Sequence, residues 1–176
     1  QSYLSNHYEG TEFDPLGHGE HAHKYRPISL AKTQESHILQ MNRPGANIHW
    51  LAMGVAAESI YVPFFNGITD TPAPYKRGKL PAQLNSAYWI FKHASVLVDS
   101  HLHDFLPLLR DVQKERNAAA IKMIAETDRR LPSLKGEARA TFLTRQSDDY
   151  ATDTLNAYKK LSLELITKMT DYCELN

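Results

Sequence analysis

The sequence is short of cysteine, of charge imbalance and of long apolar runs, and each shortage excludes a class of protein. Cysteine occurs once, at Cys173, so the chain forms no internal disulfide, which fits a reducing compartment. Lysine plus arginine and aspartate plus glutamate number 20 each, and this balance argues against a nucleic-acid partner. No apolar run approaches the length that a bilayer requires. We expect a globular, cytoplasmic protein with neither a nucleic-acid nor a membrane partner.

Complete catalytic motifs are lacking as well. The chain carries no Ser-His-Asp signature, no glycine-rich phosphate loop and no paired metal motif. Cys173 stands near the C-terminal end of a helical pattern, where the helix dipole disfavours the thiolate that a nucleophile requires. We therefore do not expect Cys173 to be a nucleophile.

The hydrophobic period changes at about residue 85. Before it, short β-branched and aromatic runs predict strands near residues 27–32, 36–41, 48–55 and 59–64, followed by a loop. Residues 48–55 are apolar on both sides, so we expect that strand to be covered on both faces. After residue 85, helical spacing predicts helices over about 86–100, 104–130 and 136–171, the last two forming an antiparallel hairpin.

The helical part also predicts caps and buried faces. Asp104 is the expected N-cap of the second helix, with Pro107 in its first turn. The expected inward side chains are Ala87, Ile90, Phe91, Ala94, Leu97 and Val98 in the first helix, and Ala151, Leu155, Tyr158, Ile166 and Met169 in the third. Strands and loops (1–85) followed by helices (86–176) predict one α+β domain, with helices on one face of an antiparallel sheet.

Histidines cluster in GHGEHAH, which holds His18, His21 and His23. On an extended segment the last two point the same way, which suits zinc or nickel. A glycine-rich stretch without cysteine is more typical of a solvated loop, and we favour that interpretation. His49 lies within an apolar strand and is expected to be a satisfied core imidazole.

A second polar cluster is KYRPISLAKTQESH, in which Arg26 and Lys32 bracket a predicted strand. A cation at a strand end can hold a substrate carboxylate or stabilise an oxyanion. An edge strand decorated with charges against aggregation has the same pattern. Spacing alone leaves both interpretations open.

Five segments, in order along the chain, resemble the bacterial dipeptidase A family. They are HYEGTEFD (7–14), YRPISLAKTQESHILQ (25–40), IHWLAMG (48–54), YVPFFNGITDTPAPY (61–75) and SAYWIFKHASVLVD (86–99), the last followed by a long helical hairpin. The resemblance covers nearly the whole chain and corresponds to the C-terminal part of that family's proteins.

This resemblance implies an N-terminal-nucleophile hydrolase, a four-layer αββα sandwich of which this chain forms half. There a cysteine at the mature N-terminus attacks the substrate and its own α-amino group is the general base. Such enzymes cleave dipeptides of many kinds and need no metal or cofactor. Since Gln1 is not cysteine, we expect a C-terminal fragment that is inactive alone and whose partner is the missing N-terminal half.

The resemblance also implies roles for particular residues. Arg26 matches an arginine that polarises the thiol or holds substrate. Lys32 stands where the family often has arginine, which weakens a substrate-binding role for it. Asn6 is comparable with the oxyanion-hole asparagine of related amidases. The motif beginning at His7 either shapes the substrate cleft or fixes a loop.

Two other functions stay open on the residues alone. One is a non-catalytic interaction module whose helical hairpin docks a partner, and the other is a histidine-dependent metal binder. A sheet that normally packs on an absent layer should expose an apolar face, so we also expect self-association into homo-oligomers.

Overall fold

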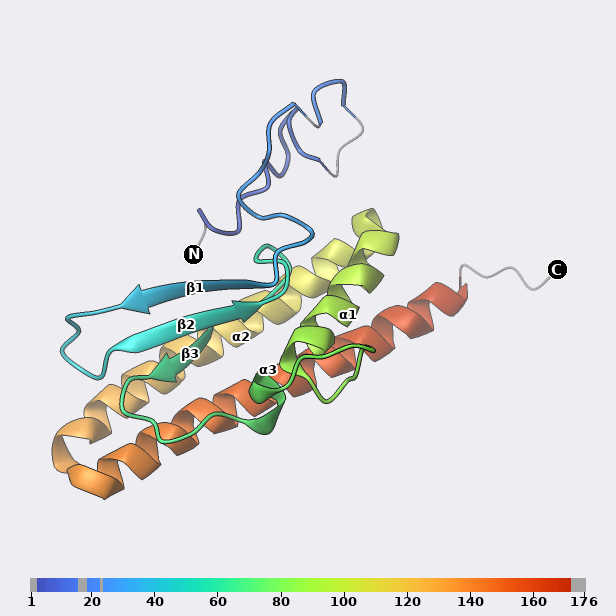
Figure 1. Cartoon of the computed structure of the whole chain (residues 1–176). Coiled ribbons are helices and arrows are strands. Elements are labelled where there is room, and N and C mark those ends of the chain that lie inside the picture. Colours follow the sequence, from blue (N-terminus) through green and yellow to red (C-terminus); the bar gives the residue numbers. More distant parts are fainter. Residues whose placement is uncertain (1–2, 16–18, 23, 172–176) are drawn as a thin grey trace.

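The computed structural model describes residues 3–15, 19–22 and 24–171, and it has the predicted order of strands before helices (Figure 1). The elements are β1 (Glu35–Gln40), β2 (Ile48–Met53), β3 (Val62–Phe65), η1 (Ala73–Lys76), α1 (Ala87–Ser100), α2 (Leu102–Arg130), η2 (Leu131–Ser133) and α3 (Gly136–Asp171). The α+β class is therefore confirmed.

The sheet has three antiparallel strands in the order β1-β2-β3. Its register pairs Ile38 with Trp50 and Leu51 with Val62. The strand predicted at residues 27–32 is wrong, because the backbone there turns instead of pairing. Pro27 has no N–H to donate, and the N–H of Ser29 donates to the carbonyl oxygen of Asn6 at 2.9 Å.

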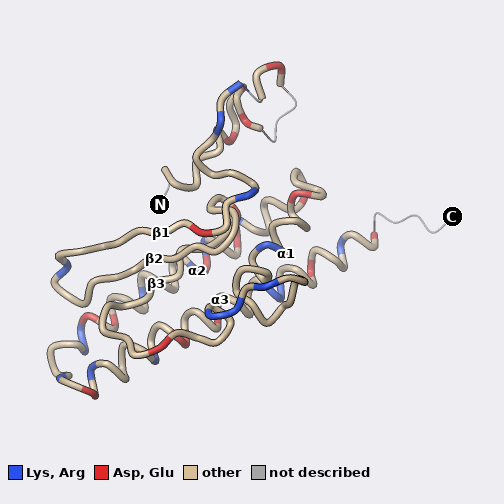
Figure 2. Tube along the Cα trace, in the orientation of Figure 1, with Lys and Arg blue, Asp and Glu red and all other residues tan. Residues whose placement is uncertain are grey.

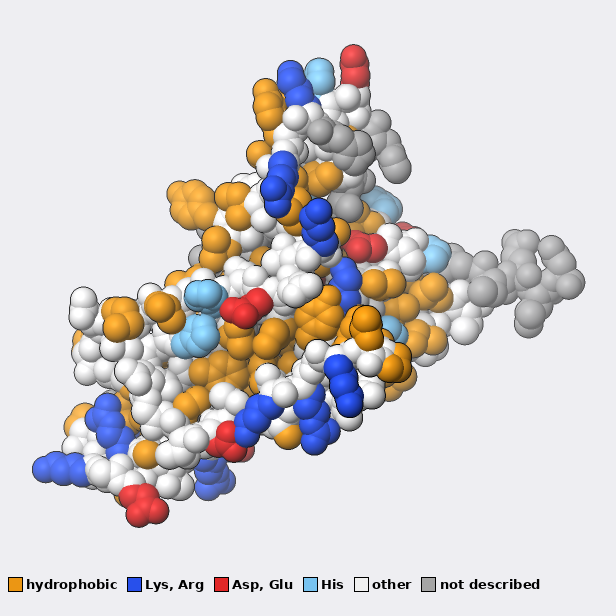
Figure 3. Space-filling model, in the orientation of Figure 1, with side chains coloured by type: hydrophobic (Ala, Val, Ile, Leu, Met, Phe, Trp, Pro, Cys, Tyr) orange, Lys and Arg blue, Asp and Glu red, His pale blue; other side chains and the backbone are white. Residues whose placement is uncertain are grey.

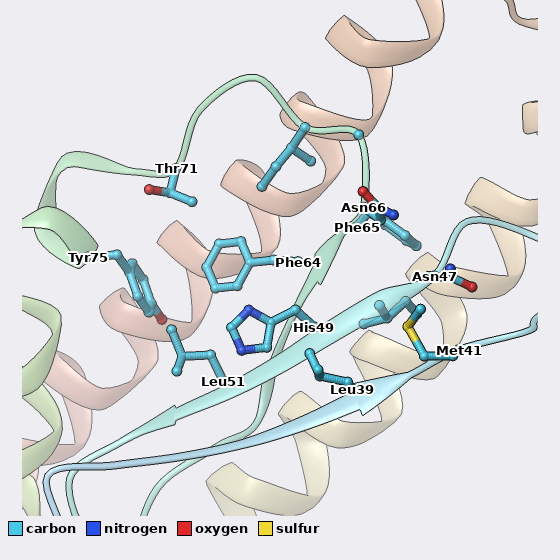
Figure 4. Close-up of a pocket in the computed structure, with 13 residues that line it drawn as sticks. Leu39, Met41, Asn47, His49, Leu51, Phe64, Phe65, Asn66, Thr71 and Tyr75 are labelled. Atoms are coloured by element: carbon cyan, nitrogen blue, oxygen red, sulfur yellow. The ribbon is translucent and has the colours of Figure 1, made fainter.

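The two faces of the sheet differ in what covers them. Ile48 and Phe65 pack against the end of the helical hairpin, where they meet Leu131 and Leu143. The helices α2 and α3 lie behind the sheet (Figures 1 and 4). Val62 and Phe64, on the opposite face of β3, belong to the core cluster formed with α1 and α3, so both faces of β3 contact the helical part.

The opposite face of β1 and β2, which we call the open face, carries His37, Leu39, Met41, His49 and Leu51. Apolar and histidine side chains lie uncovered there (Figure 3), and the Leu39 and Met41 side chains are 62% and 59% exposed. The exposure is confined to β1 and the turn after it: no residue of β2 is exposed, and Leu51 packs against the main core on this face, so the prediction that β2 is covered on both faces is confirmed.

The helical boundaries follow the sequence closely, with one correction. α1 begins after Ser86 and buries Ala87, Ile90, Phe91, Ala94 and Val98, while Leu97 is half-buried.

α2 begins at Leu102 with His101 as its N-cap, so the prediction of Asp104 as the cap is wrong. The Asp104 N–H already donates to the His101 carbonyl at 3.1 Å, which places Asp104 in the first turn. Pro107 lies inside the helix, one turn later than predicted.

α3 spans the predicted residues and returns antiparallel to α2 (Figure 1). Ala151, Leu155 and Tyr158 are buried as predicted, but Ile166 is 40% exposed. Leu161 and Leu165 are buried instead, because they continue the helical spacing of the buried stripe. Ile166 is one residue out of this spacing. No described helix is both long and apolar enough to cross a membrane.

Basic and acidic residues are both scattered along the helices (Figure 2). A local exception is the loop before α1, where Lys76, Arg77 and Lys79 stand close together in sequence.

Candidate functional site

The N-terminal segment docks on the connection between β2 and β3. The Ser5 hydroxyl donates to the Ala56 carbonyl at 3.1 Å, and the Ser29 hydroxyl accepts a hydrogen bond from the Ala57 N–H at 3.0 Å. Glu9 forms an ion pair of 2.6 Å with Arg110 on α2. These long-range bonds hold the segment against the rest of the fold.

The motif around His7 is a tight turn. Tyr8 has a φ of 64°, a left-handed conformation unusual for a residue with a side chain. The Asn6 Oδ1 accepts from the Tyr8 N–H at 2.9 Å and the Thr11 hydroxyl donates to the Tyr8 carbonyl at 2.7 Å, so both side chains hold this conformation. The turn directs His7 inward, where it is 7% exposed.

A cavity of about 400 Å³ lies where the N-terminal segment, the β2–β3 connection and α1 meet. We call it the charged pocket. Its lining includes His7, Arg26, Ser29, Val55, Glu58 and Asp99. The N-terminal segment therefore contributes an arginine and a histidine to the lining, and the β2–β3 connection and α1 contribute two acidic residues. Pockets with a few convergent polar groups are typical binding sites.

Glu58 is the most perturbed ionisable group of the charged pocket. Burial raises the pKa of its carboxyl to about 7, and the charge of Asp99 and a hydrogen bond with it act in the same direction. The Ser95 hydroxyl, which donates to the Glu58 Oε2, and the charge of Lys92 oppose this rise. A strongly shifted carboxyl in a cleft is characteristic of functional sites.

The structure brings two of the four predicted site residues together. Arg26 and His7 both line the charged pocket, although Arg26 lies in an irregular segment and not at the start of a strand. Lys32 lies on the surface, one residue beyond the pocket-lining Ala31. Asn6 does not line the pocket, and its side-chain oxygen serves the Tyr8 turn.

Glu58, Ser95 and Asp99 were not predicted from the sequence. A signal was present in GVAAESI, where Glu58 interrupts a small apolar run, because a carboxyl among buried residues is rarely accidental. Ser95 likewise falls on the buried stripe of α1. Only the fold shows that Glu58 and Asp99 line the same cavity as Arg26, and that Ser95 contacts the Glu58 carboxylate.

The histidine cluster lies mostly beyond what the structure describes. His18, His23 and also Cys173 are outside the described residues. The His21 Nδ1 lies 2.9 Å from the Glu12 Oε2 in an exposed pair. Within residues 3–15, 19–22 and 24–171, no three histidine, cysteine, aspartate or glutamate side chains converge on a metal position.

A hollow of about 490 Å³ lies on the open face, between Leu39, His49, Phe64 and Tyr75 (Figure 4). Phe64 and Tyr75 pack edge to face with ring centroids 5.2 Å apart. His49 is half-buried instead of fully enclosed as predicted. Burial and the neighbouring His37 lower its pKa. This lining is mainly apolar and carries no pair of opposite charges.

The chain is similar in sequence to known proteins. The sequence pattern described as Peptidase family C69 matches residues 1–115. The chain belongs to peptidase family C69. The matched range includes the whole lining of the charged pocket, whereas most of the helical hairpin lies beyond it.

Individual members of the family are also similar to this chain. A probable dipeptidase of Latilactobacillus sakei is 37% identical over 99% of the chain, and a probable dipeptidase B of Lactococcus lactis is 31% identical over 90%. Dipeptidase A of Lactobacillus helveticus is 26% identical over 95%. The chain spans 38%, 34% and 36% of the lengths of these relatives. The resemblance to the dipeptidase A family is thus confirmed, and the chain corresponds to little more than a third of each relative.

Proposed function

We propose that the intact protein is a cysteine dipeptidase of broad side-chain tolerance and that this chain forms part of its substrate pocket. The observation that carries the proposal is the match of nearly the whole chain to proteins named dipeptidases. The charged pocket supports it, because a dipeptide carries a cation at one end and an anion at the other.

The nucleophile, in this proposal, is an N-terminal cysteine supplied by polypeptide outside this chain. Its thiolate attacks the carbonyl carbon of the peptide bond, the amine of the second residue leaves after protonation, and water then hydrolyses the thioester. The free α-amino group of the same cysteine takes and returns the proton. No metal or cofactor takes part.

Arg26 is the residue of this chain that best serves that reaction. Its exposed side chain lines the pocket, and a guanidinium binds a carboxylate through paired, charge-assisted hydrogen bonds. His7 lines the same cavity. The oxyanion-hole role of Asn6 and the substrate-binding role of Lys32 stay predictions, and we give both residues lesser roles because neither lines the cavity.

The open face is the proposed contact with the missing half of the protein. In an αββα sandwich two sheets pack face to face, and this chain offers one sheet backed by helices. Exposed Leu39 and Met41 would be buried by such a second sheet.

The test compares the intact protein with residues 1–176 alone, using alanyl-alanine as substrate. We expect hydrolysis by the intact protein only. Arg26→Ala in the intact protein should lower kcat/KM by about tenfold to hundredfold, since a hydrogen bond to a charged group contributes about 1.5–3 kcal/mol. Arg129→Ala, which removes an exposed arginine at the far end of α2, is the matched control. Hydrolysis by residues 1–176 alone would contradict the proposal.

A further inference from the structure

The two carboxyl groups of the charged pocket lack a structural counter-charge. Glu58 is 8% exposed, yet among the described residues no ion pair joins Glu58 or Asp99 to a cationic side chain. Lys92, whose charge lowers the pKa of Glu58, donates from its Nζ to the Ala31 carbonyl at 2.9 Å. Burying a carboxyl without a paired cation costs stability, so Glu58 is poorly explained as a structural residue.

The fold nevertheless holds Glu58 firmly in this position. The Ser95 hydroxyl donates to its carboxylate, and the Tyr158 hydroxyl donates to its backbone carbonyl oxygen at 2.9 Å. Glu58 also lines the cavity that Arg26 lines. The charged and titratable groups around Glu58 are Lys92 and Asp99 of α1, Arg110 of α2, Tyr158 of α3, and His7 and Arg26 of the N-terminal segment.

We propose that Glu58, assisted by Asp99, binds the α-ammonium group of the dipeptide while Arg26 faces its α-carboxylate. This inference rests on the proposed dipeptidase function and adds a specificity to it: the pocket selects peptides with both ends free. An extended dipeptide is at most about 7 Å long, so both of its charged ends fit within one cavity of about 400 Å³.

The ammonium supplies the missing counter-charge. It donates up to three hydrogen bonds, and charge-assisted bonds of this kind are among the strongest in proteins. An N-acetylated peptide presents a neutral amide in the same place and would leave the two carboxyl groups unpaired. Sites built around a buried polar partner reject ligands that lack the matching group.

Binding should also displace a proton. The pKa of Glu58 is about 7 in the free pocket, so near neutral pH a fraction of the carboxyl is protonated. An ammonium stabilises the charged form, and the dipeptide therefore releases protons when it binds. For the same reason KM for alanyl-alanine should fall as pH rises through about 7.

The experiment uses the intact protein, with alanyl-alanine as substrate and N-acetyl-alanyl-alanine as competitive inhibitor. Glu58→Gln should raise KM for alanyl-alanine by about tenfold to hundredfold, the loss expected for a hydrogen bond to a charged group. The inhibition constant of the acetylated peptide should change less than about twofold, since it offers Glu58 no cation. Glu126→Gln, an exposed carboxyl on α2, is the matched control and should change neither constant.

Asp99→Asn is the second variant, chosen because the Asp99 side chain is exposed and its loss does not threaten folding. It should act in the same direction with a smaller effect. Calorimetry on intact protein whose N-terminal cysteine is replaced by alanine measures proton release at pH 7, which Glu58→Gln should abolish.

The possible results separate the two proposals. If the intact protein fails to hydrolyse alanyl-alanine, the proposed dipeptidase function is overturned and this inference falls with it. If it hydrolyses alanyl-alanine but the variants weaken both peptides by the same factor, or leave KM unchanged, the function stands and the ammonium site is overturned.

Discussion

The Tyr158 hydroxyl on α3 donates a hydrogen bond of 2.9 Å to the carbonyl oxygen of Glu58, 100 residues earlier in the chain. Tyr158 is fully buried, and its ring packs edge to face on Phe91 of α1 with centroids 4.5 Å apart. From α2, the Gln113 side chain donates to the carbonyl oxygens of Ala57 and Ser59. The helices therefore fix the backbone of the β2–β3 connection on both sides of the pocket carboxyl.

Tyr158→Phe should destabilise the chain by about 1–3 kcal/mol, because it leaves a buried carbonyl oxygen without its donor. The ring and its packing are retained, so the loss reports the hydrogen bond. Urea unfolding followed by circular dichroism measures it. Tyr3→Phe makes the same change at a side chain that is 81% exposed and should be neutral. Equal effects of the two substitutions would refute a role for the Tyr158 hydroxyl.

The stability of the chain should depend on pH through Glu58. Burial, together with Asp99, raises the pKa of its carboxyl from 4.5 to about 7 in the folded state. Between these values the folded chain holds a proton that the unfolded chain has released, so rising pH favours unfolding. The free energy of unfolding should therefore fall between pH 5 and pH 8, with Glu58 contributing between about 1 and 3 kcal/mol.

Glu58→Gln isolates this contribution, since glutamine retains the acceptor for Ser95 but does not titrate. The unfolding free energy of the unchanged chain minus that of Glu58→Gln should fall as the pH rises, and it should level off below about pH 5. A difference that stays constant from pH 5 to pH 8 would show that Glu58 keeps an ordinary pKa.

The sequence predicted the helices far better than the strands and the site. Helical spacing located α1 and α3 because each buries one regular stripe, which local sequence specifies. The segment around Ser29 looked like a strand, but a hydrogen bond to Asn6, distant in sequence, decided its conformation. Arg26 and His7 were predicted from the resemblance and line the charged pocket, whereas Glu58 and Asp99 join this lining only through the packing of α1 on the β2–β3 connection.

Gly45→Ala should destabilise the β1–β2 turn by about 1–3 kcal/mol, the usual cost of forcing an atom into filled space. A Cβ at this position would overlap the Asp128 carboxyl. That carboxyl has little freedom to move, because Arg43 holds it at 2.6 Å and also donates to the Ala46 carbonyl. Thermal unfolding measures the loss.

Gly78→Ala is the control, since a Cβ there meets nothing within 4 Å. In the background of Asp128→Ala the overlap disappears, so adding Gly45→Ala to that variant should cost much less than it costs alone. Equal costs in the two backgrounds would contradict a steric origin.

The open face should make the isolated chain self-associate. Leu39 and Met41 are adjacent on this face and largely exposed, and contiguous exposed apolar surface favours association. Replacing both with asparagine should lower the association constant of the dimer by about tenfold or more, which corresponds to a loss of roughly 1.4 kcal/mol of binding free energy. Sedimentation velocity measures this loss as a smaller dimer fraction. Their exposure in the monomer means that folding should be little affected.

Ile121→Asn and Leu163→Asn, exposed at 69% and 66% on the helices, are the matched controls and should leave association unchanged. If the helical substitutions weaken association equally, the contact between the chains lies on the helical hairpin. That result would favour the interaction-module hypothesis over the proposal that the open face receives a second sheet.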